Sequence, residues 1–232
     1  MKAKQVIALE RDFAVIFDMD GVLFDTENIA QQCWKKAAEI VGWPEWRETY
    51  LKVVGSTMDV QNREVQNALG EKGAEQFRHT IRSQFNVGFG VQPLPQKPGV
   101  PEVLNVLKEH QIPTAVASST VKDYVIRNIS GAQLEDYFKV MIGGDQIENS
   151  KPAPDIFLAA AQELGYAPEK CYVVEDSFNG IRSAHAAGTH PLMVPDVLEP
   201  TEEIRGLAER VFPSLREAAE YFSQLLHEEK NV

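Results

Sequence analysis

The sequence has few cysteines and no long hydrophobic run. Only two cysteines, Cys33 and Cys171, occur among the 232 residues, and they lie far apart in the chain. A disulfide framework is therefore not expected. No apolar stretch approaches the roughly 20 residues that a membrane-spanning helix needs, and residues 1–12 lack the apolar centre of a secretory signal. We expect a cytoplasmic protein without a membrane partner.

Positive charge is also scarce. The chain has 23 lysine and arginine residues against 34 acidic ones, which gives a formal net charge of −11. Such a chain lacks the general positive field with which proteins bind nucleic acid, so we expect no nucleic-acid partner. The 44% of hydrophobic and 25% of charged residues are typical of a globular protein. We expect a monomer or a weak homodimer.

Short apolar runs that predict buried strands alternate with stretches of helical periodicity. The predicted strands are residues 13–17, 114–117, 140–142, 171–174 and 191–194. The predicted helices are residues 100–110, 121–129, 155–164 and 178–187. This alternation is typical of a parallel sheet with helices on both faces. We therefore predict an α/β fold with a Rossmann-like three-layer core.

Residues 26–92 interrupt this alternation, because they show helical periodicity without a convincing strand. The apolar residues of the first predicted helix there form one stripe: Ile29, Cys33, Ala37, Ile40 and Val41. We interpret the stripe as packing rather than as a cofactor site. The predicted domains are a core made of residues 1–25 and 93–232, and a small inserted α-helical domain made of residues 26–92.

Two acids directly follow the first predicted strand. Asp18 and Asp20 are two residues apart, so on an extended chain their side chains point the same way, and Gly21 permits a turn after them. One carboxylate of such a pair can attack an electrophile or bind a metal while the other transfers a proton. For this pair taken alone, a solvated acidic turn is the alternative interpretation.

Three further polar signals occur later in the chain. Ser118 and Ser119 stand at an expected helix start, where hydroxyl groups and free amides can bind a phosphate or only cap the helix. Lys151, beside prolines, could offset the charge of a phosphoryl group or be a solvated loop residue. Glu175 and Asp176 supply the hard oxygen ligands that suit Mg²⁺.

All four signals lie at the carboxyl ends of predicted parallel strands or in the loops just beyond, where open α/β sheets place their sites. In order and in residue type they resemble the motifs of the haloacid dehalogenase superfamily, in its branch with a helical cap. Residues 150–157 and 175–181 are particularly similar to the branch that contains β-phosphoglucomutase and related sugar-phosphate phosphatases. The inserted helical domain would then be a mobile cap.

The resemblance also implies a mechanism. Asp18 would be the nucleophile that forms an aspartyl-phosphate, and Asp20 the general acid and base, with Ser118 and Lys151 as further catalytic residues. The residues implied to bind the phosphorylated substrate are Ser118, Ser119, Lys151 and Thr26. The cofactor would be Mg²⁺, and the residues implied to hold it are Asp18, Asp20 (through its backbone carbonyl), Glu175 and Asp176.

The chain departs from the β-phosphoglucomutase pattern at two positions. Those enzymes have a histidine where this chain has Ala30 and a lysine where it has Val121. Both differences favour hydrolysis of the phosphoenzyme, so we predict a phosphatase of a small phosphorylated metabolite of the sugar or polyol phosphate class. A sugar phosphomutase is the alternative enzyme, and a non-catalytic protein that binds a phosphate ligand is the alternative from another class. The second acid, Asp20, argues against a dehalogenase.

The sequence gives only weak signals for the residues that contact the substrate beyond its phosphate group. In the inserted domain the loop 55–58 could turn toward the site. Side chains that could shape the site, with ordinary packing or exposure as the alternative, are Trp43, Trp46, Arg47 and Arg63.

Overall fold

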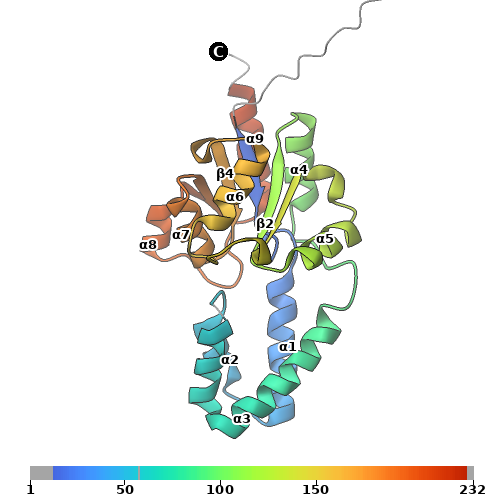
Figure 1. Ribbon diagram of the computed structural model, residues 1–232, viewed down its shortest axis with the longest axis vertical. Coiled ribbons are helices and arrows are strands. Elements are labelled where there is room, and N and C mark those ends of the chain that lie inside the picture. The colour runs from blue at the N-terminus through green and yellow to red at the C-terminus, as the bar shows by residue number, and fades with distance from the viewer. Residues whose placement is uncertain (1–12, 57, 229–232) are drawn as a thin grey trace, which may run out of the picture.

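The chain folds around a parallel β-sheet (Figure 1). The computed structural model describes residues 13–56 and 58–228. Within them the strands are β1 (Ala14–Phe17), β2 (Thr114–Ser118), β3 (Val140–Gly143), β4 (Cys171–Glu175), β5 (His190–Met193) and β6 (Arg210–Val211). They form one sheet in the order β3-β2-β1-β4-β5-β6, and every neighbouring pair is parallel. The first strand therefore lies inside the sheet, between β2 and β4.

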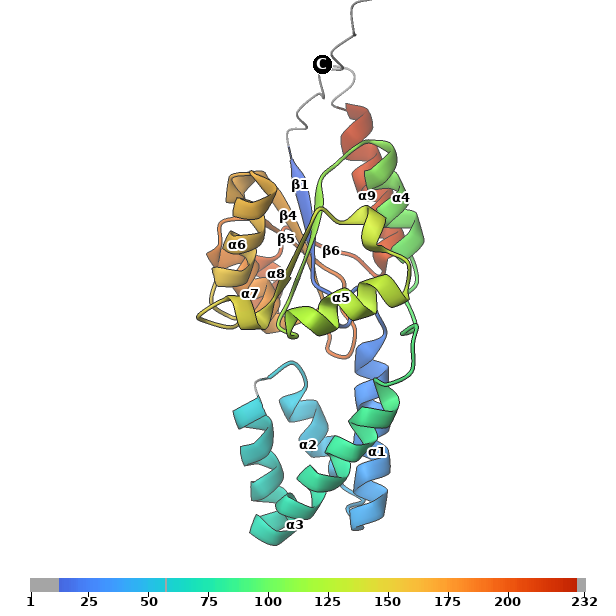
Figure 2. The same cartoon turned by 45° about the vertical axis from the view of Figure 1, so that its right-hand side comes forward.

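Helices cover both faces of this sheet (Figure 2). One face carries α4 (Val100–Glu109), α5 (Lys122–Gly131) and α9 (Leu215–Glu228). The other carries α6 (Asp155–Leu164), α7 (Phe178–Ala186) and α8 (Glu202–Leu207). Side chains of β1 alternate between the two cores: Val15 and Phe17 pack on the first side, Ala14 and Ile16 on the second. A strand buried on both faces has to be apolar throughout, and the predicted α/β fold is confirmed.

A helical body lies beyond the carboxyl end of β1 (Figure 1). It consists of α1 (Thr26–Val41), α2 (Trp46–Val53) and α3 (Met58–Gly88), and α3 is interrupted at Gly70, where φ is +67°. Aromatic rings form its centre: Trp34 packs against Phe77 with ring centroids 5.0 Å apart, and against Tyr50 at 5.4 Å. The expected inserted helices are therefore present. The boundaries at residues 26 and 92 stay a prediction.

Several details differ from expectation. Ile40 was expected in the packed stripe of α1 but is 60% exposed, because it falls on the outer side of the helix. Trp43 is buried in the helical core and Trp46 packs against it, while Arg47 and Arg63 are exposed, so the packing and exposure alternatives hold for all four. Thr57, which belongs to the loop 55–58 that could turn toward the site, lies outside the described residues. Residues 1–12 lie outside them as well.

The elements α8, β6 and α9 were not predicted. Strand β6 is only two residues long, which is too short for a periodic signal. Of the helices in the described part of the chain, none is both long and apolar enough to cross a membrane.

Candidate active site

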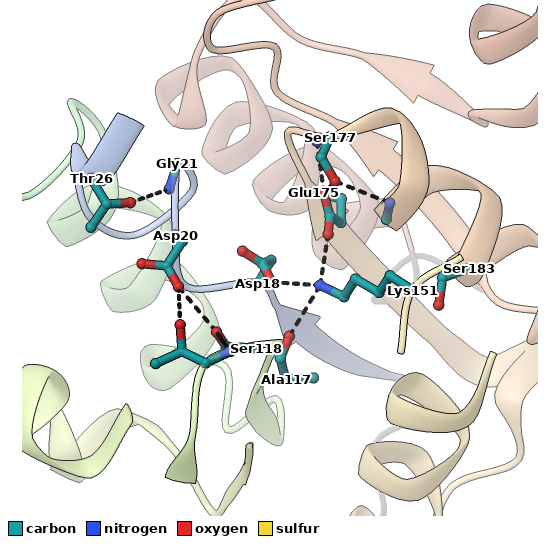
Figure 3. A network of polar contacts seen from close by, with 12 residues as sticks. Asp18, Asp20, Gly21, Thr26, Ala117, Ser118, Lys151, Glu175, Ser177 and Ser183 are labelled. Atoms are coloured by element: carbon teal, nitrogen blue, oxygen red, sulfur yellow. Dashed lines mark hydrogen bonds and ion pairs between the residues drawn. The ribbon is translucent and has the colours of Figure 1, made fainter. Parts of the chain in front are cut away.

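Polar side chains from three neighbouring strands and one loop meet at the carboxyl edge of the sheet (Figure 3). Phe17 pairs in register with Val116 of β2 and with Val174 of β4. The residues that follow these positions therefore arrive at the same edge. The amide of Asp18 still donates to the carbonyl of Val174, at 3.0 Å, so the ladder between β1 and β4 fixes the backbone of Asp18.

Lys151 joins two buried carboxylates at this edge. Its Nζ lies 2.5 Å from Oδ1 of Asp18 and 2.7 Å from Oε1 of Glu175, and it also donates to the carbonyl of Ala117 at 3.4 Å. The three charged side chains are between 1% and 8% exposed. The lysine comes from the loop after β3, so it reaches the site from outside the strand ends. The structure thus brings together three of the predicted site residues.

Burial and close neighbours shift the pKa values of these groups. Burial raises the pKa of Asp18 to about 8; Lys151 opposes this rise, while Glu175 and Asp20 add to it. Burial alone would lower the pKa of Lys151, but the attraction of Asp18 and Glu175 outweighs it and raises that pKa above its usual value. Burial, followed by Glu175 and Asp18, raises the pKa of Asp176. Ionisation of these buried carboxyl groups is therefore unfavourable, and Lys151 offsets only part of the cost at Asp18.

The acids Asp18, Glu175 and Asp176 fit a divalent metal ion. Each can place one carboxylate oxygen so that the three atoms lie within 4.8 Å of one another. Gly21 makes room for this arrangement, because a Cβ at that residue would lie only 2.2 Å from Oδ2 of Asp176. Hard oxygen donors with unbalanced negative charge are the ligands that Mg²⁺ prefers.

Glu175 is held more firmly than the other two acids. Its Oε1 contacts Lys151, and its Oε2 accepts hydrogen bonds from the amide of Ser177 at 2.7 Å and from the Ser177 hydroxyl at 3.0 Å. Gly180 packs directly on this carboxylate, because a Cβ there would lie 1.8 Å from it. Both oxygens of Glu175 are therefore engaged, and it mainly positions Lys151. Ser177 and Gly180 were not predicted as site residues.

Asp20 is bound by hydroxyl groups at the end of β2. Its Oδ2 accepts a hydrogen bond from Oγ of Ser118 at 3.1 Å (Figure 3). It accepts a second one from Oγ1 of Thr120 at 2.8 Å. Two of the predicted site residues, Asp20 and Ser118, are therefore in contact. Thr120 was not predicted as a site residue, although it is the third hydroxyl residue of the run 118–120.

Thr26 ties the acidic loop to the first inserted helix. Its hydroxyl accepts a hydrogen bond from the amide of Gly21 at 3.0 Å and donates to the carbonyl of Phe24 at 3.4 Å. Thr26 is buried, so the geometry gives its hydroxyl a place in shaping the loop that carries Asp20. Its expected part in substrate binding stays a prediction.

Two adjoining cavities, which we call the first and the second lobe, open above these residues. The first lobe, of about 890 Å³, is lined by the predicted site residues Asp18, Asp20, Ser118, Ser119, Lys151, Glu175 and Asp176 and by residues of the helical body. The second lobe, of about 550 Å³, shares Asp20, Glu27 and Thr120 with the first and continues along α5. Both volumes suit small-molecule ligands.

The helical body contributes to both lobes. Gly55 and Met58 line them, and the carbonyl of Gly55 accepts a hydrogen bond from Nδ2 of Asn179 at 3.1 Å. Glu27 of α1 accepts a hydrogen bond from the hydroxyl of Tyr50 at 3.3 Å, and burial raises the pKa of Glu27 to about 7. Neither Glu27 nor Tyr50 was predicted, because only the folded chain brings α1 and α2 together at the site.

Comparison with known proteins gives one family. The model of the haloacid dehalogenase-like hydrolases matches residues 15–194. A phosphorylated carbohydrates phosphatase from Thermotoga maritima is 37% identical over 180 residues, which cover 75% of this chain and 81% of that protein. Fructose-1-phosphate phosphatase YqaB from Escherichia coli is 28% identical, with 77% of this chain and 94% of YqaB covered.

The solved structures agree with this assignment. The crystal structure of a HAD family hydrolase from Deinococcus radiodurans, with bound phosphate and sodium, is 28% identical to this chain and has a TM-score of 0.74. The alignment covers 88% of this chain and 92% of that one. The chain belongs to the haloacid dehalogenase-like hydrolases and is a phosphoric monoester hydrolase of that family.

Proposed function

We propose that this protein is a Mg²⁺-dependent phosphatase that hydrolyses a small sugar or polyol phosphate through an aspartyl-phosphate on Asp18. The observation that carries the proposal is the buried contact of Asp18 with Lys151 at the floor of the first lobe, next to Glu175 and Asp176. The names of the two phosphatase relatives favour the substrate class, since both act on phosphorylated carbohydrates.

Asp18 attacks phosphorus with the oxygen that Lys151 leaves free. Lys151 holds Oδ1, so Oδ2 is the attacking atom. A bond forms between Oδ2 and phosphorus while the bond from phosphorus to the ester oxygen breaks. The cation of Lys151 offsets the negative charge that gathers on the nucleophile and the phosphoryl oxygens.

Asp20 transfers protons in both half-reactions, the formation and the hydrolysis of the aspartyl-phosphate. Ser118 and Thr120 fix its Oδ2, which leaves Oδ1 to donate a proton to the departing alcohol oxygen. The same carboxylate then takes a proton from the water that attacks phosphorus, while the bond from phosphorus to Oδ2 of Asp18 breaks. Inorganic phosphate leaves and the carboxylate of Asp18 is regenerated. The exposed Ser119 at the first lobe binds a phosphoryl oxygen. Ser118 does so when the single proton of its hydroxyl turns from Asp20 to the phosphate, and Thr120 then holds Oδ2 of Asp20.

Asp18 and Asp176, with Glu175 nearby and the backbone carbonyl of Asp20, would hold Mg²⁺. When bound, the ion offsets the repulsion between the anionic nucleophile and the anionic phosphate. The protein's own contribution is the fixed geometry of these oxygens, which Gly21 and Gly180 allow by leaving room for the carboxylates.

Water, rather than a rebound sugar phosphate, is the proposed acceptor of the phosphoryl group. Ala30 lines the second lobe with only a methyl group, and Val121 is 46% exposed at the start of α5. Neither side chain can donate a proton or a positive charge to a sugar phosphate. The helical body is the proposed cap, residues 26–92, which excludes bulk water when it closes. A cytoplasmic location and a monomeric or weakly dimeric state stay predictions.

Phosphate release tests the proposal. Sugar phosphates, polyol phosphates and nucleotides are screened with Mg²⁺, and the variant Asp18→Asn is the blank. We expect release from at least one sugar or polyol phosphate, abolished by chelation and lowered about 10³-fold or more in Asp18→Asn. Unchanged activity in that variant would sink the assignment of the nucleophile. Formation of an isomeric sugar phosphate faster than release of phosphate would instead favour a phosphomutase.

A further inference from the structure

The second lobe has charges of opposite sign at its two ends. Among the residues that line it, only three are charged. Asp20 and Glu27 lie at the end that it shares with the first lobe, and Arg127 lies on α5 beyond the shared residues. The remaining lining residues are neutral, and many are aromatic: Trp34, Tyr50, Phe85, Phe89 and Tyr124. Aromatic walls with a few polar groups are typical of ligand sites.

Arg127 is held in place by neutral partners. Its guanidinium lies over the ring of Tyr124, with 4.6 Å between Cζ and the ring centroid. Its Nη2 donates to the carbonyl of Phe89 at 3.4 Å and to Oδ1 of Asn128 at 3.3 Å, and its Nε donates to the same Oδ1 at 3.4 Å. These contacts fix the position of the guanidinium without using its Nη1.

In the part of the chain that the structure describes, Arg127 has no carboxylate as an ion-pair partner. Among residues 13–56 and 58–228, no Asp or Glu oxygen lies within 4.0 Å of its guanidinium nitrogens. Arg182, which lines the first lobe, is different, because Glu203 accepts hydrogen bonds from its Nε at 2.8 Å and its Nη2 at 3.0 Å. The guanidinium of Arg127 therefore remains available to an anion, and its planar donors suit a carboxylate or a phosphate.

The inner end of the second lobe excludes such an anion. Asp20 and Glu27 stand there without a lysine or arginine of the lobe beside them, so a second negative group of the ligand would be repelled at that end whenever these acids are ionised. Neutral hydroxyl groups would be accepted there, since the carboxylate of Glu27 accepts hydrogen bonds. A complementary ligand is neutral and hydroxylated near Asp20 and anionic at its far end.

We propose that the second lobe binds the leaving group of the phosphate ester and that Arg127 recognises an anionic group at the far end of that leaving group. The inference rests on the proposed function, because Asp20, at the entrance of the lobe, must reach the ester oxygen. The substrate class is then narrower: a polyol or sugar phosphate with a carboxylate or a second phosphate at the other end. Arg127 is a specificity residue and takes no part in the bond changes.

A matched pair of esters tests this proposal. 6-Phosphogluconate and glucitol 6-phosphate have the same chain, and differ in a carboxylate or a hydroxymethyl group at the end far from the phosphate. We expect the 232-residue chain with Mg²⁺ to have a kcat/KM roughly tenfold higher for 6-phosphogluconate, as a charge-assisted hydrogen bond allows. In Arg127→Gln the ratio should fall to near one.

Two further variants separate recognition from other effects. Lys122→Gln removes the same charge from α5 at a residue that lines neither lobe, and it should keep the wild-type ratio. A merely structural effect of Arg127→Gln on the chain near Phe89 would lower kcat/KM for both esters and leave the ratio unchanged. Lys52→Gln removes the cation that the helical body presents to the first lobe, and it should also keep the ratio.

The outcomes that overturn the inference are distinct from failure of the proposed function. A wild-type ratio near one, a ratio that survives in Arg127→Gln, or a ratio lost in Lys52→Gln would each remove Arg127 from recognition. No Mg²⁺-dependent phosphate release from any polyol or sugar phosphate would overturn the proposed function, and with it the assignment of the lobe to a leaving group.

Discussion

Replacing Lys151 by methionine removes the cation between two buried carboxylates while most of the side-chain volume remains. The lysine side chain is 7% exposed, and its partners Asp18 and Glu175 are 8% and 1% exposed. In the variant Glu175 stays away from water without its counter-ion, and Asp18 becomes harder to ionise, because Lys151 no longer lowers its pKa. Removal of one partner from a buried ion pair typically costs about 3–5 kcal/mol, so we expect a loss of that size in the free energy of unfolding at pH 8.5.

The loss should depend on pH with a definite sign. The pKa of Asp18 is raised from 3.8 to about 8 in the folded protein. Its contribution to stability is therefore greatest below the unfolded value and is lost as the pH rises through the folded one. At pH 6 Asp18 is mostly protonated in the metal-free protein, so Lys151 mainly stabilises Glu175. At pH 8.5 Lys151 stabilises two ionised carboxylates, and its removal costs more.

Urea unfolding without Mg²⁺ measures this loss. Far-UV circular dichroism is the better probe, because all three tryptophans, Trp34, Trp43 and Trp46, lie in the helical body and their fluorescence reports on that part. The matched variants are Glu175→Gln and the double variant with Lys151→Met. The free energy of unfolding of the double variant should fall by about 1–3 kcal/mol less than the sum of the decreases in the two single variants. A loss below about 1 kcal/mol at pH 8.5, or equal losses at pH 6 and pH 8.5, would refute the reasoning.

Three further predictions concern the metal, the packing and the acid. Because burial raises the pKa of Asp18 to about 8 and also raises that of Asp176, Mg²⁺ should displace protons and bind more tightly as the pH rises toward 8; calorimetry in two buffers that shows no proton release at pH 7 would contradict this. Gly180→Ala places a Cβ 1.8 Å from a buried carboxylate and should cost about 1–3 kcal/mol in thermal unfolding, whereas Gly206→Ala, with open space around it, should not. Thr120→Val should lower kcat about tenfold, since a hydrogen bond to a charged group is lost, and Thr120→Ser should restore it; equal kcat in all three proteins would exclude a role for the hydroxyl.

The sequence could predict those parts of the site that lie at strand ends. Asp18, Ser118 and Glu175 each end an apolar run, and parallel strands in register bring their ends to one edge. The residue type and the position at the end of a strand were therefore enough to predict these three residues as members of the site. The order of the main helices could be predicted as well, because two parallel strands that follow each other in the chain are usually joined by a crossover helix.

The rest of the site depends on contacts that no local pattern encodes. Glu27 and Tyr50 belong to different helices of the inserted body and meet only after folding. Thr120 contacts Asp20 across 100 positions of sequence, and taken locally its hydroxyl is indistinguishable from a helix cap. That Arg127 has no carboxylate partner among the described residues depends on distances between side chains, which a sequence does not give.

The hydrogen bond between Gly21 and Thr26 connects the loop that carries Asp20 to the first helix of the helical body. Thr26 is the first residue of α1, and Gly21 directly follows Asp20. A rotation of α1 would therefore pull on the loop that carries Asp20, the proposed proton donor. Opening of the helical body would misplace Asp20 at the moment when bulk water enters, so the phosphoenzyme would be least able to activate water when it is most exposed to it. The lifetime of the aspartyl-phosphate would then be set by the position of a helix as much as by the chemistry of its own carboxylate.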